Sequence, residues 1–186
     1  LGQDNLETNE ANRRGEIGSG SLFFPMGICS GNDQHVFVAD KDNHRILIWN
    51  KIPFNNGWNA DVCLGQPGFD EREPNRGEYD KAGPDTLSFP TGVFFDVENE
   101  RIFGVDQGNH RVLIWNKLPS ENGTAPDLIL GQKETMNGIV PFSKDDTELI
   151  DVISLQAGIA LENKLLIQNL EKQQKSVRNI IRSIGN

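Results

Sequence analysis

The sequence has few cysteines and few basic side chains. It contains 2 cysteines in 186 residues, and its 27 Asp and Glu against 18 Lys and Arg give a net charge of -9. Cys29 and Cys63 are too few for a disulfide framework and form no CxxC pair, so we expect small buried side chains without a bond. The acidic charge argues against a nucleic-acid partner, because phosphate binding needs a basic surface. No run approaches the roughly 18 apolar residues of a membrane span.

The composition changes along the chain. All three tryptophans and most glycines lie in residues 1–132, and no aromatic residue follows Phe142. We therefore predict a first domain at 1–132, a linker at 133–142 and a second segment at 143–186. The chain begins at Leu1 without a charged and then apolar leader, from which we expect a cytoplasmic protein with a truncated N-terminus, and a fragment or fusion.

An internal repeat dominates the first domain. Residues 40–53 return at 106–119, 66 residues further on, with the shared pattern Asp-x-x-Asn-His-Arg, an apolar run and Trp-Asn-Lys-x-Pro. Asn56-Gly57 and Leu64-Gly65-Gln66 return at the same spacing, as Asn122-Gly123 and Leu130-Gly131-Gln132. Leu1-Gly2-Gln3 repeats the last of these once more, so we expect the chain to open on the tail of an earlier repeat.

Each repeat has the pattern of four short strands punctuated by Gly, Asn and Asp. Residues 46–49 are apolar on both alternating faces, which is typical of a strand between two layers. Four-stranded sheets covered on both sides are blades of a β-propeller. We predict strands at 27–29, 36–39, 45–49 and 61–64, and again at 92–95, 102–105, 111–115 and 127–130.

These residues resemble the NHL repeat over about residues 22–132. The resemblance implies a β-propeller, and because propellers have about 4–8 blades, two repeats imply an incomplete ring. The predicted fold is mainly β, an incomplete propeller of about two four-stranded NHL-type blades, followed by a long coiled-coil-like C-terminal α-helix. Some propellers of this kind resemble metal-dependent lyases, which would need His clusters at the axis of a closed ring.

The signature residues are the candidate binding residues. One interpretation is a ligand or metal surface; the other is structural, with Asp and Asn satisfying turn amides and His and Arg joining blade to blade by hydrogen bonds. A catalytic site is usually a single set of residues in the protein, whereas these four residues occur once in each repeat. Their recurrence therefore favours the structural interpretation. The candidates are Asp40, Asn43, His44, Arg45, Asp106, Asn109, His110 and Arg111.

Two further features leave alternatives open. The long acidic loops at 4–21 and 67–87 suggest a calcium site, but they lack regular Asp spacing, so we expect solvated loops. Asn122-Gly123-Thr124 fits a glycosylation acceptor, but its counterpart Asn56-Gly57 favours a turn. We predict no catalytic residue, no metal and no cofactor.

Residues 144–182 have the pattern of one long helix with heptad spacing. A polar Asn163 at an a position is typical of a two-stranded coiled coil, and from it we expect a homo-oligomer through this helix. The alternative is a single amphipathic helix folded back over the blades. The predicted oligomerisation residues are Leu149, Val152, Ile159, Asn163, Leu166, Leu170, Val177 and Ile180.

Residues 137–167 resemble the closing segment of a GAF domain, through Pro141-Phe142-Ser143-Lys144-Asp145-Asp146 and Gln156-Ala157-Gly158-Ile159-Ala160-Leu161-Glu162-Asn163. The resemblance implies a signalling coiled coil that leads to an output domain. A bacterial origin is implied instead by the NHL-type repeats, because their Leu-Gly-Gln-Pro-Gly-Phe segment at 64–69 and their Trp-Asn-x-x-Pro tails resemble a bacterial long-repeat version. Two functions are therefore predicted. The first is a non-enzymatic binding and oligomerisation module whose blades present loops to a protein or ligand. The alternative is the input region of a signalling enzyme, a nucleotide cyclase or histidine kinase, whose catalytic domain lies beyond Asn186.

Overall fold

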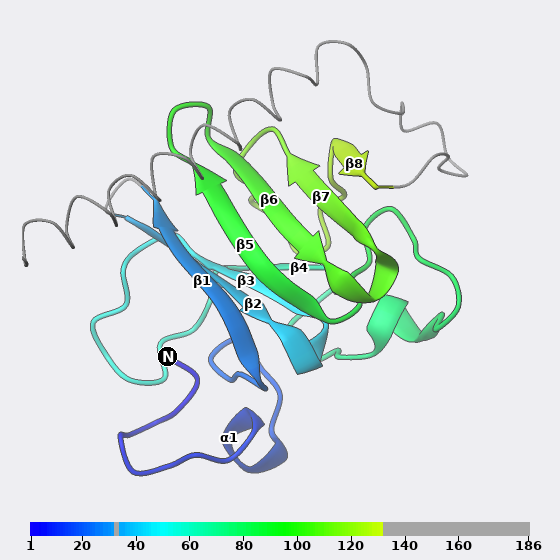
Figure 1. The fold of residues 1–186 in the computed structure, drawn as a ribbon. Coiled ribbons are helices and arrows are strands. Elements are labelled where there is room, and N and C mark those ends of the chain that lie inside the picture. The colour runs from blue at the N-terminus through cyan, green and yellow to red at the C-terminus, as the bar shows by residue number, and fades with distance from the viewer. Residues whose placement is uncertain (32–33, 132–186) are drawn as a thin grey trace, which may run out of the picture. The chain divides into compact units, whose positions relative to one another are not determined.

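The computed structural model describes residues 1–31 and 34–131 (Figure 1). The predicted linker, the helix over 144–182 and all eight predicted oligomerisation residues lie outside the described residues. The coiled coil and the GAF-like segment therefore stay predictions. No helix in the described part is long and apolar enough to cross a membrane.

Two four-stranded antiparallel sheets make up the described part, and both follow chain order. Every predicted strand is present, with bounds that differ by at most two residues from the prediction. The mainly β fold with two four-stranded antiparallel sheets, which we call blade 1 and blade 2, is thus confirmed. Blade 1 consists of β1 (Pro25–Gly31), β2 (His35–Asp40), β3 (Arg45–Trp49) and β4 (Val62–Leu64). Blade 2 consists of β5 (Pro90–Asp96), β6 (Arg101–Asp106), β7 (Arg111–Trp115) and β8 (Leu128–Leu130).

The two blades share one register. Val38 pairs with Leu47 between β2 and β3, and Gly104 pairs with Leu113 at the equivalent place between β6 and β7. In each blade a short 3-10 turn joins these two strands, and it ends on a histidine with left-handed backbone, at a φ of 52° or 54°. These two turns are η1 (Lys41–Asn43) and η3 (Gln107–Asn109), and the other short helical elements of the described part are α1 (Asn12–Gly15) and η2 (Pro74–Gly77).

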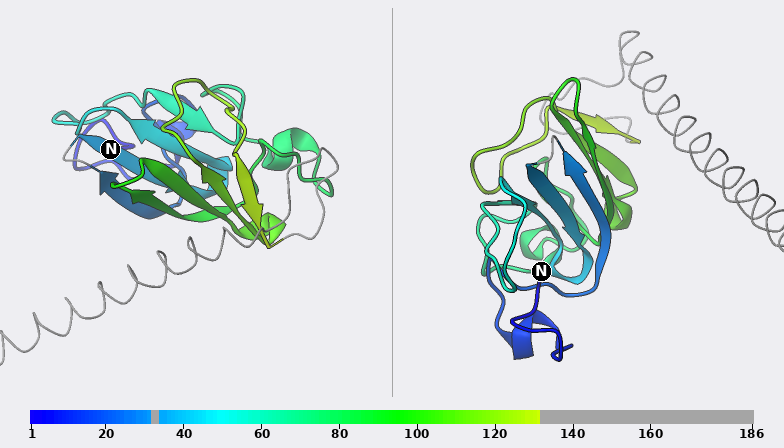
Figure 2. Two further views of the ribbon diagram at one scale, coloured as in Figure 1. Left: turned by 90° about the horizontal axis from the view of Figure 1, so that it is seen from above. Right: turned by 90° about the vertical axis from the view of Figure 1, so that its left-hand side faces the viewer.

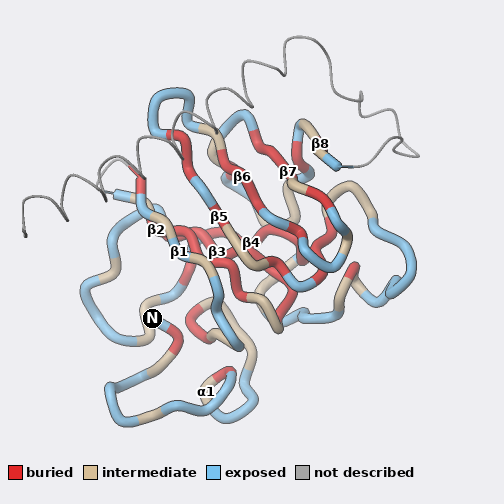
Figure 3. The backbone as a smooth tube through the Cα atoms, in the orientation of Figure 1, coloured by how far each residue is buried: buried red, intermediate tan, exposed pale blue. Residues whose placement is uncertain are grey.

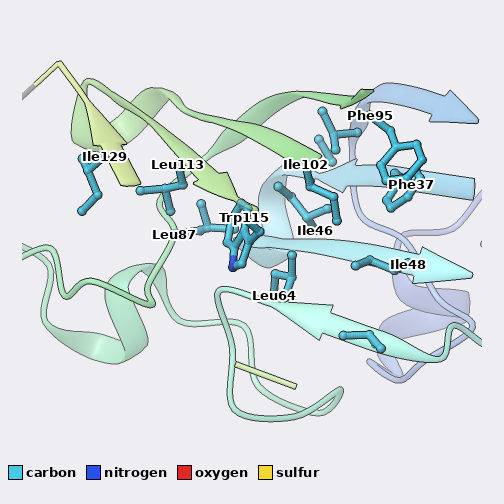
Figure 4. Packing of buried hydrophobic residues seen from close by; sticks show 13 residues of the cluster. Phe37, Ile46, Ile48, Leu64, Leu87, Phe95, Ile102, Leu113, Trp115 and Ile129 are labelled. Atoms are coloured by element: carbon cyan, nitrogen blue, oxygen red, sulfur yellow. The ribbon is translucent and has the colours of Figure 1, made fainter. Parts of the chain in front are cut away.

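The main core lies between the blades. We call the side of each blade that carries its β3 or β7 tryptophan the front and the opposite side the back. The back of blade 1 packs on the front of blade 2, and the rings of Phe37 and Phe95 stack there at 4.9 Å (Figure 4). This interblade core includes Phe37, Ile46, Ile48, Phe95, Ile102, Leu113 and Trp115.

Glycines allow the first strands of the two blades to approach closely, and β1 lies beside β5 (Figures 1 and 2). A Cβ on Gly27 would lie 2.8 Å from the Cα of Gly92 and 2.9 Å from the Thr91 carbonyl oxygen. These are backbone atoms that cannot move aside, so a side chain at residue 27 would push the blades apart.

The front of blade 1 carries a second, smaller core. Its strands β3 and β4 are buried along their whole length (Figure 3). Leu47, Trp49 and Cys63 are fully buried in this core, and three side chains from the connecting loops, Leu22, Trp58 and Phe69, pack against it. Cys63 on β4 and Cys29 on β1 are both free thiols at opposite edges of blade 1, and Cys29 is only half-buried.

Candidate functional site

Asp40, at the end of β2, is the centre of a buried polar network. Its side chain has no exposed surface, and both carboxylate oxygens accept hydrogen bonds. Oδ1 accepts from the Phe23 backbone N–H at 2.7 Å. Oδ2 accepts from the Asn43 amide at 2.7 Å and from Nε of Arg45 at 2.8 Å. Three donors therefore compensate the burial of one carboxylate, which would otherwise be costly.

Arg45 joins this network to the connecting loops through hydrogen bonds to loop carbonyls. Its Nη2 donates to the Gly18 and Ser21 carbonyls at 3.1 and 3.0 Å, and its Nη1 donates to the Phe69 carbonyl at 2.6 Å. The guanidinium is itself fully buried. The planar fork of arginine thus fastens two loops to β3, which a lysine could not do with the same geometry.

Blade 2 repeats the network. Oδ2 of Asp106 accepts from the Asn109 amide and from Nε of Arg111, each at 2.7 Å. Arg111 Nη2 donates to the Gly83 and Thr86 carbonyls at 2.8 and 2.9 Å. The structure thus brings three of the four predicted residues of each blade together. Their side-chain polar groups bond to the protein itself, which supports the structural interpretation without testing ligand binding.

Sequence reasoning missed two asparagines that complete these networks. The Asn12 and Asn43 amides donate to each other at 2.9 and 2.8 Å, and Asn75 and Asn109 form the same reciprocal pair at 3.0 and 2.8 Å. Asn12 and Asn75 are buried and have positive φ values, 47° and 51°, which asparagine tolerates better than most residues. The signal was present, because the dipeptide Asn12-Arg13 returns as Asn75-Arg76.

The two loops at 4–21 and 67–87 keep their acidic side chains exposed or partly exposed, as predicted, and they also bury a few polar residues against the blades. Each loop places one asparagine and one arginine against the blade, because its backbone turns through left-handed conformations at these residues. Arg13 donates to the Gly57 carbonyl at 2.8 Å and pairs with Asp4, while Arg76 pairs with Asp85. Within the described residues, no group of three His, Cys, Asp or Glu is placed to hold a metal ion.

His44 connects the two blades. Its Nδ1 accepts a hydrogen bond from the Phe89 backbone N–H at 3.0 Å, and its ring meets the Phe89 ring edge-on at 4.4 Å. Phe89 immediately precedes β5, so the contact crosses from blade 1 to blade 2. An accepting Nδ1 needs the neutral ring, and burial lowers the pKa of His44 below its ordinary value, against the opposing influence of Asp42 and Glu73.

This geometry predicts a pH-dependent loss of stability. Because the folded pKa of His44 is below the unfolded value of 6.5, the unfolded chain binds more protons between the two values. The stabilisation by His44 is therefore complete above about pH 6.5 and falls as the pH drops through the folded pKa. We expect wild type to lose more stability than His44→Asn between about pH 7.5 and pH 5 in urea titrations. Parallel losses in the two proteins would contradict this assignment.

The described thiols are not poised for nucleophilic chemistry. Burial raises the pKa of Cys63 to about 12 and that of Cys29 to about 11. Both therefore stay protonated near neutral pH, whereas a reactive cysteine needs its thiolate form.

Comparison with known proteins agrees with the repeat pattern. No curated protein matches the chain. The family model of the NHL repeat matches residues 24–49, which span β1, β2, η1 and β3 and hold the first Asp-x-x-Asn-His-Arg network.

Proposed function

We propose that the chain is a non-enzymatic protein-interaction module in which two propeller blades present an exposed aromatic surface. The NHL repeat match suggests a propeller module that binds proteins. The internal bonding of the signature residues supports the same view, because side chains already engaged in the fold have little capacity left for a ligand. The observation that carries the proposal is a pair of exposed phenylalanines in strained backbone.

These are Phe24 and Phe89, which precede β1 and β5 and occupy equivalent places in the two repeats. Their side chains are 59% and 41% exposed, and their φ values are 54° and 49°. A non-glycine residue in this region costs on the order of 1–3 kcal/mol, a strain often found at functional sites. Two bulky apolar side chains thus remain exposed although their backbone conformation is unfavourable, so the surrounding structure must hold them in place.

Lys41 lies between the two rings. Its Nζ is 4.9 Å from the Phe24 ring centroid and 5.2 Å from the Phe89 centroid, within cation–π range, and 2.9 Å from the Asp42 carboxylate. We call Phe24, Lys41 and Phe89 the aromatic rim. Aromatic residues are enriched in protein interfaces, and the ammonium adds a place for a partner carboxylate. The rim therefore fits a protein partner with an apolar side chain beside an acidic one.

The test is capture by the immobilised chain from an extract of its source cells. We expect wild type to retain a specific protein, the Phe24→Ser/Phe89→Ser variant to lose at least tenfold of it, and the control Phe54→Ser to retain it. Phe54 is 76% exposed and lies outside the rim. Equal retention by all three chains, or no specific retention at all, would contradict the rim as the binding surface.

Pairing through the 144–182 helix and the input role in a signalling enzyme remain separate proposals. Both concern residues outside the described part or beyond Asn186. The same capture experiment separates the rim from the helix, because the two phenylalanine substitutions leave the heptad positions unchanged.

A further inference from the structure

The hydrogen bond that His44 makes to blade 2 ends on an atom that takes up protons. Nδ1 of His44 accepts from the Phe89 backbone N–H at 3.0 Å, so the bond uses the lone pair that a proton would occupy. A protonated imidazole has only donors, and the Phe89 N–H is also a donor. The bond between these two groups therefore exists only while the ring is neutral.

The backbone of His44 is fixed on both sides. Its N–H donates to the Lys41 carbonyl at 3.1 Å, and its carbonyl accepts from the Gln66 amide at 3.2 Å. The residue as a whole is only 6% exposed. We therefore expect a change at this contact to move its other side, which is Phe89, and not the backbone of His44.

Phe89 lies between two residues that blade 2 holds. The Ser88 N–H donates to Asp106 Oδ1 at 2.7 Å, and the Ser88 carbonyl accepts from a backbone N–H of η3 at 2.8 Å. On the other side, Pro90 begins β5 and pairs with Asp106. Within the described residues, the Phe89 N–H donates to no acceptor other than His44. Phe89 can thus change its conformation while both of its neighbours stay in place.

The conformation of Phe89 is one that contacts with blade 1 help to enforce. Its φ is 49°, whereas the proline that follows favours an extended backbone at negative φ. Strained backbone of this kind persists only while the surrounding structure holds it. The Phe89 ring meets the His44 ring edge-on at 4.4 Å, and Lys41 Nζ lies 5.2 Å from its centroid. Protonation of His44 removes the hydrogen bond and places a second cation near Lys41.

Three charged groups act on the His44 ring. Burial lowers the pKa of His44, Asp42 of η1 and Glu73 of the loop before β5 raise it, and Lys41 of η1 lowers it. The part of blade 2 that touches the ring is Phe89, which carries no charge. The ring is therefore neutral above its ordinary value of 6.5 and becomes charged at a lower pH, a step that the two carboxylates favour.

We propose that His44 is a latch on the aromatic rim, and that a proton on its Nδ1 releases Phe89 and removes one of the two rings that flank Lys41. Binding at the rim is then strongest while His44 is neutral and weakens on acidification, because a released Phe89 must be ordered again before a partner docks. This inference rests on the proposed function, since it concerns the regulation of the same surface.

A second contact between the blades provides an internal control. The Gly123 N–H donates to the Cys63 carbonyl at 2.8 Å, and the Cys63 N–H donates to Asn122 Oδ1 at 2.8 Å. The turn predicted at Asn122-Gly123 is confirmed. Neither acceptor of this contact is a titrating group, so acidification should leave it intact unless the blades separate.

The test is amide hydrogen exchange of the full chain, followed by NMR between about pH 7.5 and about pH 4.5 together with the titration of the His44 ring. We expect the protection of the Phe89 amide to fall with the same midpoint as the ring, by about tenfold for each pH unit below it. The Gly123 amide should keep its protection. In His44→Asn, which has no titrating ring and suits left-handed backbone, Phe89 protection should not depend on pH.

Three results would overturn the latch. The Phe89 amide could keep its protection through the His44 midpoint, both amides could lose protection together, or His44 could stay neutral until the chain unfolds. Capture from the extract at the two pH values then tests the effect on the rim. We expect wild type to release on acidification the protein that it retains at neutral pH, and His44→Asn to retain equal amounts at both. Equal retention by wild type at both pH values would also overturn the proposal.

The latch and the proposed function fail in different ways. If the chain captures no protein at either pH, the proposed function is contradicted, while amide exchange still decides whether His44 holds Phe89. If capture succeeds but does not depend on pH, the rim stands as a binding surface and its regulation by His44 does not.

Discussion

Replacing Arg45 by alanine is expected to lower the free energy of unfolding by about 3–5 kcal/mol, the cost of breaking a buried ion pair from one side. The substitution leaves the Asp40 carboxylate buried with one fewer donor and frees the carbonyls of Gly18, Ser21 and Phe69 from their shared partner. Because the two connecting loops meet blade 1 at this guanidinium, the loss is not confined to one hydrogen bond. Urea unfolding followed by tryptophan fluorescence measures the effect.

Two control variants show whether the loss of stability in Arg45→Ala comes from breaking a buried ion pair or from removing any arginine. Arg14→Ala removes an arginine whose side chain is 77% exposed and whose Glu10 partner lies 3.8 Å away, so it should change stability by less than about 0.5 kcal/mol. Arg45→Ala combined with Asp40→Ala should cost less than the sum of the single changes, since no unpaired charge remains. Equal losses for Arg45→Ala and Arg14→Ala would contradict the structural role of the network.

The strand positions could be predicted to within two residues because the two repeats have the same pattern 66 residues apart, so each strand assigned in one repeat is supported by its copy in the other. Each repeat has one run of apolar residues, from Ile46 to Trp49 and from Val112 to Trp115. Successive side chains of a strand point to opposite faces, so such a run buries all of its side chains only in a strand that is covered on both faces. The sequence predicted the first strand of blade 1 at 27–29, whereas β1 pairs with β2 from Pro25 to Gly31. The register shifts between Pro25 and Gly27, and this irregularity allows Pro25 to pair with Asp40. Strand ends depend on such local pairing, which a residue pattern does not specify.

The candidate residues were also found from the sequence, but their partners were not. Asn43 and Asn12 are 31 residues apart, and Asn12 lies in a segment whose composition suggested a solvated loop. Its burial depends on a left-handed turn and on the distant edge of blade 1, and neither is encoded in local periodicity. The sequence signal for this contact was the recurrence of Asn12-Arg13 as Asn75-Arg76, each followed shortly by Gly-Glu, and it is short enough to be overlooked.

Replacing Ile46 by alanine is expected to cost about 2–5 kcal/mol of unfolding free energy, because it opens a cavity in the interblade core. Ile46 is fully buried on the back of blade 1. Opposite it on blade 2 is Gly104, and a Cβ there would lie 2.7 Å from Ile46 Cδ1. The equivalent change on the back of blade 2, Val112→Ala, should cost less, because Val112 is only partly buried.

A second substitution at the same contact tests whether the two blades pack at this point. In the wild-type chain, Gly104→Ala should destabilise by about 1–3 kcal/mol, since the added methyl group overfills the space beside Ile46 and Trp115. In the Ile46→Ala chain the same methyl group enters the cavity, so Gly104→Ala should be neutral or stabilising. A double-mutant cycle from urea unfolding therefore gives a change of sign between the two backgrounds. Additive effects would mean that Ile46 and Gly104 do not meet, and that the blades are not held together by this core.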